Sequence, residues 1–156
     1  MTQTPKALYT VLATAEMVTW TGLIAAIIAR YGFGYDGPLF FVAGLSHGII
    51  FLAYCITAVV VGMNQRWSFS TIVLALVMAV PPYATLPFDR WLIKNGKLVG
   101  DWRLEHQGDP RDDASLDRFL RFWLRHPVWF FIAITAVMAV LLTVLLLLGS
   151  PTQWGR

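Results

Sequence analysis

Four long apolar blocks restrict what this chain can fold into more than any other feature of its sequence. They cover about Ala7–Ile28, Leu39–Met63, Phe69–Phe88 and Pro127–Leu148. Each block reaches the roughly 20 residues that a helix needs to cross about 30 Å of hydrocarbon. Hydrophobic residues make up 57% of the chain and charged residues 13%, whereas soluble domains average about 45–50% and 25%. The sequence therefore predicts an integral membrane protein.

A backbone inside lipid must satisfy its own hydrogen bonds, and the four blocks lack the alternation of membrane-barrel strands. We therefore predict an all-α membrane protein with four transmembrane helices. The expected organisation is a three-helix membrane core over residues 1–92, a polar loop with an amphipathic helix over 93–126, and a fourth helix with a short tail over 127–156.

The segment before the fourth block predicts an amphipathic helix that lies in the membrane interface, with Ser115 as its N-cap. Its apolar side chains recur at helical spacing: Leu116, Phe119, Leu120, Trp123 and Leu124. Its opposite face carries Arg118, Arg121 and Arg125. Such a helix either rests on the membrane surface without a specific ligand, or binds anionic lipid or a partner protein. Asp89 and Arg90, at the end of the third block, are assigned to the same interface.

The distribution of charge predicts an orientation. With four spans, nine basic residues (Arg30 and eight between positions 90 and 125) lie on one side, against Lys6, Arg66 and Arg156 on the other. Because basic loops stay in the cytoplasm, the long loop is predicted to be cytoplasmic and both termini to lie outside a bacterial plasma membrane. Acidic residues are mixed among the basic ones, which argues against a nucleic-acid surface.

Two ionisable residues, Glu16 and His47, stand well inside the first and second blocks. Such residues are costly in a membrane, so we expect the two side chains to face each other inside the bundle. Tyr54, two helical turns after His47, could add a hydroxyl. The pair is interpreted first as structural; a proton relay, a metal site and a haem ligand are the alternatives. Further ligands are not found at this depth, so the sequence predicts no cofactor and no metal.

Three other features of the apolar blocks suggest how the helices pack. Gly44 and Gly48 form a small-xxx-small pattern, which predicts that the second helix is tightly packed against a neighbour inside or outside the chain. Consecutive Pro81 and Pro82 predict a kink or break in the third helix. The single cysteine, Cys55, excludes an internal disulfide.

Three segments, "LATAEMVTW", "GLSHGIIFLAYC" and "LPFDRWL", together resemble a family of small bacterial integral membrane proteins of uncharacterised function, common in actinobacteria. The matching positions are Glu16, Gly44, His47, Gly48, Phe51, Tyr54, Phe88, Asp89 and Arg90. The likeness covers about Ala7–Leu92, so the later loop and last helix look like an addition. In size, topology and general character the chain is also similar to the association factor of actinobacterial cytochrome bcc–aa3 respiratory supercomplexes.

The sequence lacks a phosphate-binding glycine loop, zinc-ligand spacing and a G-x-S-x-G motif, so it does not predict an enzyme. The resemblance implies a non-catalytic accessory subunit that contacts membrane lipids and larger integral membrane proteins, with cytochrome bcc and aa3 subunits as the best guess. The alternative function is a small homo-oligomeric transporter or proton-conducting protein that uses Glu16 and His47. Internal repeats, which many transporters contain, are not evident.

Overall fold

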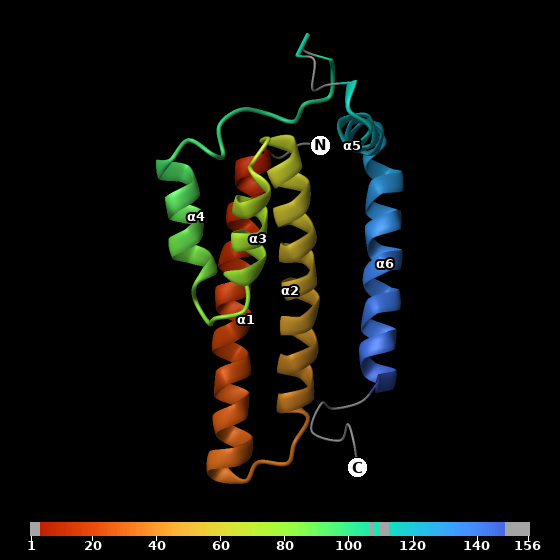
Figure 1. Ribbon diagram of the computed structural model, residues 1–156. Helices are drawn as coiled ribbons and strands as arrows, with labels where there is room; N and C mark the ends of the chain where they lie inside the picture. The colour runs from red at the N-terminus through yellow and green to blue at the C-terminus, as the bar shows by residue number, and fades with distance from the viewer. Residues whose placement is uncertain (1–3, 107, 110–112, 149–156) are drawn as a thin grey trace.

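The computed structural model describes residues 4–106, 108–109 and 113–148, and all regular elements within these ranges are helices (Figure 1). They are α1 (Pro5–Phe33), α2 (Leu39–Asn64), α3 (Phe69–Val77), α4 (Thr85–Lys94), α5 (Ser115–Arg125) and α6 (Pro127–Leu148). Within the described residues, α1, α2 and α6 are long and apolar enough to cross a membrane. The chain is therefore an all-helical membrane protein with three such helices, where the sequence predicted four.

Local signals explain where α1 begins and ends. The Thr4 hydroxyl accepts a hydrogen bond from the Ala7 N–H at 3.1 Å, and Pro5 occupies the first turn, where its missing N–H has no cost. Gly34 ends the helix with φ 69°, a left-handed conformation that glycine adopts without strain. A short connection then returns the chain as α2, antiparallel to α1 (Figure 1).

The third apolar block does not form one helix. Ser68 caps α3, which has only nine residues and therefore rises about 13 Å, less than half of the hydrocarbon core. Pro81 and Pro82 lie in the turns that follow, where consecutive prolines cannot continue a helix, and Tyr83 has φ 67°. Figure 1 shows α4 running back toward the end from which α3 started. We call residues 69–94 the hairpin.

The hairpin changes the arrangement of the chain ends. Because it returns to the side that it left, the start of α1, the loop after α4, and α5 all lie at one end of the bundle, which we call the loop end (Figure 1). Leu8 of α1, Trp102 of the loop and Pro127 of α6 line the same cavity there. In the structure the start of α1 thus lies at the same end of the bundle as the long loop, whereas the sequence predicted that both termini lie opposite that loop.

The core of the described bundle lies near the loop end, between α1, α2 and the hairpin. Tyr9, Tyr54, Val61 and Leu92 are completely buried within it. Close packing here depends on Gly62, because a Cβ at this position would lie 2.8 Å from Cγ1 of Ile72. The glycine of α2 that permits a close internal approach is thus Gly62, in the last turn of the helix.

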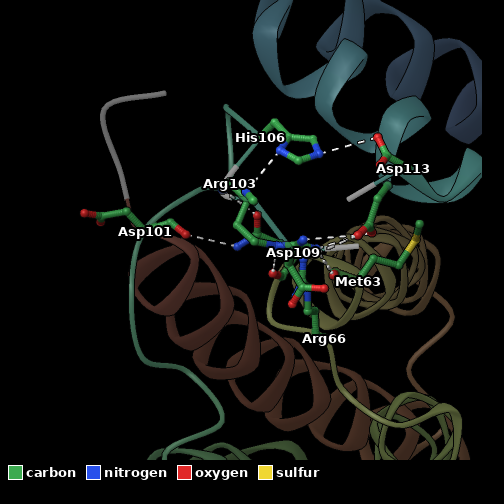
Figure 2. Close-up of polar contacts among 10 residues, drawn as sticks. Met63, Arg66, Asp101, Arg103, His106, Asp109 and Asp113 are labelled. Carbon is green, nitrogen blue, oxygen red and sulfur yellow. Dashed lines mark hydrogen bonds and ion pairs between the residues drawn. The ribbon is translucent and has the colours of Figure 1, made fainter. Parts of the chain in front are cut away.

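Arg103 joins the polar loop to the end of α2. Its guanidinium donates to the carbonyls of Met63 and Asn64 at 2.8 and 2.6 Å, so it caps helix carbonyls that lack intrahelical partners. The same guanidinium contacts the Asp117 carboxylate of α5 at 3.2 and 3.3 Å. Figure 2 shows these contacts together with the nearby ion pair between Arg66 and Asp109.

Helix α6 packs less closely than the other long helices. An apolar cavity of about 370 Å³ separates its first turns from α2. Its lining includes Ala53, Ile56, Val60, Phe130, Phe131 and Ile134. The position of α6 therefore depends strongly on α5 and on the loop contacts made by Arg103.

Candidate functional site

The structure brings Glu16 of α1 and His47 of α2 together inside the bundle. Oε2 of Glu16 lies 3.9 Å from Nδ1 of His47. Glu16 is completely buried and His47 is 9% exposed. This is the juxtaposition that the sequence analysis expected for two ionisable groups within antiparallel spans.

Hydrogen bonding differs between the two members of the pair. Nδ1 of His47 lies 3.2 Å from the Thr19 hydroxyl, and the imidazole contacts the Trp20 ring with 4.4 Å between centroids. Both carboxylate oxygens of Glu16 and the indole nitrogen of Trp20 are buried without a hydrogen-bond partner in the described part of the chain. Burying a carboxylate without a hydrogen-bond partner is costly, unless the carboxylate takes up a proton or is bound by another group.

The turn of the hairpin packs along the same part of α1 as Glu16. The Thr85 hydroxyl donates to the Ala13 carbonyl at 3.0 Å, and the Thr21 hydroxyl lies 3.4 Å from the Tyr83 hydroxyl. The end of the turn, just after Pro81 and Pro82, is therefore attached to α1 at two points that bracket Glu16 along that helix. Non-helical backbone at membrane depth is tolerated where protein surrounds it or a polar cavity accepts it.

Tyr54 does not join the pair. Its hydroxyl lies 2.6 Å from the Tyr9 hydroxyl and donates to the Ala75 carbonyl at 3.3 Å. The seven-residue spacing predicts that Tyr54 lies on the same face of α2 as His47, but the sequence carries no signal for Tyr9 as its partner. The two tyrosines form a separate buried polar contact between α1, α2 and α3.

Gly44 and Gly48 are not closely packed inside the chain. A Cβ at either position would meet no atom of another element within 4 Å. They line a groove of about 400 Å³ together with Arg30, Phe40, Phe41, Leu45 and Leu142. Among the described residues these glycines therefore have no close internal neighbour, and the predicted tight packing stays a prediction for a neighbour outside the chain.

Asp89 and Arg90 have different environments, although the sequence analysis assigned both to the interface. Arg90 is exposed, whereas Asp89 is 3% exposed and accepts hydrogen bonds from the Thr10 hydroxyl at 3.0 and 3.2 Å. Burial raises the pKa of Asp89, while the Thr10 hydrogen bond and the positive charges of Lys6 and Arg90 oppose that increase. Asp89 thus links α4 to α1.

Within the described residues, the structure gathers no group of three or more His, Cys, Asp or Glu side chains suited to a metal ion. The chemistry available at the pair is that of one carboxyl and one imidazole, which can hold or exchange a proton. Thr19 was not singled out in the sequence, although its position three residues after Glu16 places it on the same helical face.

The fold and the buried pair define a helical integral membrane protein. The family described as Domain of unknown function (DUF3817) matches residues 6–94, more than half of the chain, and the chain belongs to that family. This match covers α1, α2 and the hairpin. The expected resemblance to a bacterial membrane protein family of uncharacterised function is therefore confirmed.

A Streptomyces coelicolor protein named "Putative membrane protein SCO5905" is 32% identical to this chain over 91 residues. The aligned region is 58% of this chain but only 11% of that protein. No solved structure matches the chain.

Proposed function

We propose that the protein is a non-catalytic accessory subunit of the bacterial plasma membrane that packs against a larger integral membrane protein. One observation carries this proposal: in the Streptomyces coelicolor relative, the 91 residues that match this protein make up only 11% of the whole polypeptide. In that protein the unit is covalently joined to a much larger polypeptide. A unit that forms a small part of a much larger protein in one relative is expected to pack against a larger membrane partner of the same kind here.

The groove at Gly44 and Gly48 supports this proposal. Small residues four positions apart let a second helix approach the backbone closely, and within the described residues no atom of another element lies within 4 Å of a Cβ at either position. A transmembrane helix of the larger protein is the occupant that suits an apolar groove between spans. Arg30 at the edge of the groove would then contact the partner near the opposite end from the loop.

The specific partner we propose is a cytochrome bcc–aa3 respiratory supercomplex. The support for it is the likeness in size and general character to the association factor of such assemblies. Three long helices replace the four on which the likeness in topology rested. The class of partner, a larger membrane protein, therefore has broader support than this one example.

Purification in mild detergent from the native membrane tests the proposal. Wild-type protein should be recovered with a larger membrane protein in a fixed ratio, and Gly48→Ile should lose it. Gly22→Ile is the matched control, because Gly22 is exposed on α1 with no atom near a Cβ. Equal recovery of the partner with both variants would contradict the assignment of the groove.

A second candidate function, proton transfer in a small homo-oligomeric transporter or proton-conducting protein, is favoured by one observation. Glu16 is completely buried, unpaired by hydrogen bonds and 3.9 Å from His47. If the pair moves protons, protein reconstituted in liposomes should dissipate a pH gradient and Glu16→Gln should not. Absence of flux with wild-type protein would leave the accessory role as the proposal.

We also propose that the loop end is cytoplasmic. Of the ten basic residues that the structure describes, nine lie on the hairpin, the loop, α5 or the adjoining ends of α1 and α2, whereas Arg30 lies toward the opposite end. The positive-inside rule then places the start of α1 in the cytoplasm, together with the loop.

A further inference from the structure

Helix α5 presents three different faces, and two of them are settled by contacts within the chain. Leu120 and Leu124 are 5% and 2% exposed, so one face packs against the protein. Beside them Asp117 turns toward Arg103 and Arg66, at 3.2 and 3.9 Å. The one acidic side chain of α5 is therefore engaged on the inner side of the helix.

A second face of α5 is apolar and uncovered. Leu116, Phe119 and Phe122 are 69%, 61% and 56% exposed. Figure 1 shows α5 nearly end-on, while α6 runs down the picture directly from it. Because α6 is a candidate span that begins at Pro127, α5 crosses it at the level where a span meets the headgroups. Exposed aromatic side chains at this level suit insertion among lipid chains.

The third face carries the arginines around a surface pocket of about 370 Å³. Its lining consists of His106, Arg118, Arg121, Phe122, Arg125 and His126. At one side of the pocket, Nε2 of His106 contacts the Asp113 carboxylate at 3.4 Å. Three guanidinium groups of α5 thus line one surface pocket, while an adjoining face of the same helix is apolar.

We propose that this pocket binds the phosphate of an anionic phospholipid of the leaflet at the loop end. Guanidinium groups form paired, charge-assisted hydrogen bonds with phosphate oxygens. The apolar face of α5 would place the helix among the acyl chains, which fixes the arginines at phosphate depth. A membrane lipid satisfies both faces at once, whereas free phosphate or an acidic protein would leave Phe119 and Leu116 in water.

Native mass spectrometry of the full chain in neutral detergent tests the proposal, with phosphatidylglycerol and phosphatidylcholine as probes. Wild-type protein should retain phosphatidylglycerol preferentially. The triple variant Arg118→Gln/Arg121→Gln/Arg125→Gln should bind it roughly a hundredfold more weakly. Arg90→Gln/Lys94→Gln/Lys97→Gln is the matched control for net charge and should bind like the wild type.

Arg125 also donates to the Leu104 carbonyl at 2.7 Å, so the triple variant could lose structure. Two further variants keep the test valid. One is the single variant Arg118→Gln, at an exposed position, and the other is the triple variant Arg118→Lys/Arg121→Lys/Arg125→Lys. Both should fold and bind phosphatidylglycerol with intermediate affinity. Equal binding of the two lipids, unchanged binding by the triple glutamine variant, or full displacement by inorganic phosphate would overturn the proposal.

Discussion

At the scale of single residues, Glu16 and His47 pose the main energetic question. A carboxyl group without a hydrogen-bond partner beside an imidazole at 3.9 Å is not a fully satisfied pair. His47 has a partner in Thr19, so Glu16 is the member whose burial costs most. The pair contributes to stability only to the extent that His47 offsets this cost.

A double-mutant cycle measures that offset. His47→Phe should lower the free energy of unfolding by about 1–3 kcal/mol, because it leaves the Glu16 carboxyl group buried without its neighbour. Glu16→Met should cost less, because His47 keeps Thr19 as a partner. The double variant should lose less than the sum of the singles, by at least about 0.5 kcal/mol. Reversible unfolding in detergent micelles is the measurement.

The control cycle combines Glu16→Met with Thr57→Val, a buried position ten residues further along α2. Changes at such separated sites should add. Additivity in the Glu16–His47 cycle as well would show that the two side chains are neighbours without an energetic interaction.

Asp89 gives a prediction with a defined dependence on pH. Its pKa in the folded protein is raised by burial, so the folded state holds the proton more tightly than the unfolded state. Stability of the wild type therefore falls as pH rises from the ordinary aspartate pKa to the raised one. Asp89→Asn keeps an oxygen for Thr10 but carries no charge, so it escapes this loss.

The melting temperature of Asp89→Asn should therefore equal that of the wild type at low pH and exceed it at neutral pH. Thermal unfolding at several pH values is the measurement. Asp36→Asn, at an exposed position between α1 and α2, is the control and should show no such trend. A lower melting temperature for Asp89→Asn at neutral pH would mean that Lys6 and Arg90 outweigh burial.

The sequence allowed some of these residues to be identified but not others. Glu16 and His47 could be paired because charged groups in lipid need partners and helical rise gives their depths. Tyr9 and Thr10 could not be found, since tyrosine and threonine are common in apolar helices and carry no comparable signal. The hydrogen bond from Thr10 to Asp89 joins positions 79 residues apart, which local patterns do not encode.

At the scale of elements, the hairpin is the main departure from expectation. Hydropathy identifies apolar length, and the third block was long enough to cross. Two short helices joined by a turn contain the same apolar sequence without crossing, and hydropathy cannot distinguish the two arrangements. Pro81 and Pro82 predicted an interruption, but a kinked span and a reversal have the same sequence signal.

Cysteine labelling distinguishes a hairpin from a span. In a Cys55→Ala background, cysteines at Ser70 and Asn95 should react with an impermeant reagent from the same side of the membrane, because both lie at the loop end. A cysteine at Asp36 should react from the opposite side. All three native positions are exposed. Labelling of Asn95 together with Asp36, and not with Ser70, would show that the third block crosses the membrane.

At the scale of the whole molecule, the chain consists of a family unit and an added segment. The family match at residues 6–94 ends with α4, and α5 and α6 follow it. The likeness to the family that the sequence shows ends near Leu92, close to the end of the family match. The contact between the two parts could not be predicted, since Arg103 is one of several arginines in a mixed-charge loop.

Arg103 should therefore control how firmly α5 and α6 are held. Its side chain joins two α2 carbonyls to Asp117 of α5, and the adjoining apolar cavity offers α6 little further packing. Arg103→Ala should lower the free energy of unfolding by about 2–3 kcal/mol through the lost charge-assisted hydrogen bonds. Amide hydrogen exchange in α5 and the first turn of α6 should increase more than in α1 and α2.

Two variants separate the geometry of this contact from its charge. Arg103→Lys keeps the charge but cannot reach both carbonyls and Asp117 with one planar group, so it should recover only part of the protection. Arg118→Ala removes an exposed arginine from the outer face of α5 and should leave exchange unchanged. Faster exchange throughout the bundle in Arg103→Ala would mean that Arg103 stabilises the family unit itself. Unchanged exchange in α5 would mean that contacts other than Arg103 hold the added segment in place.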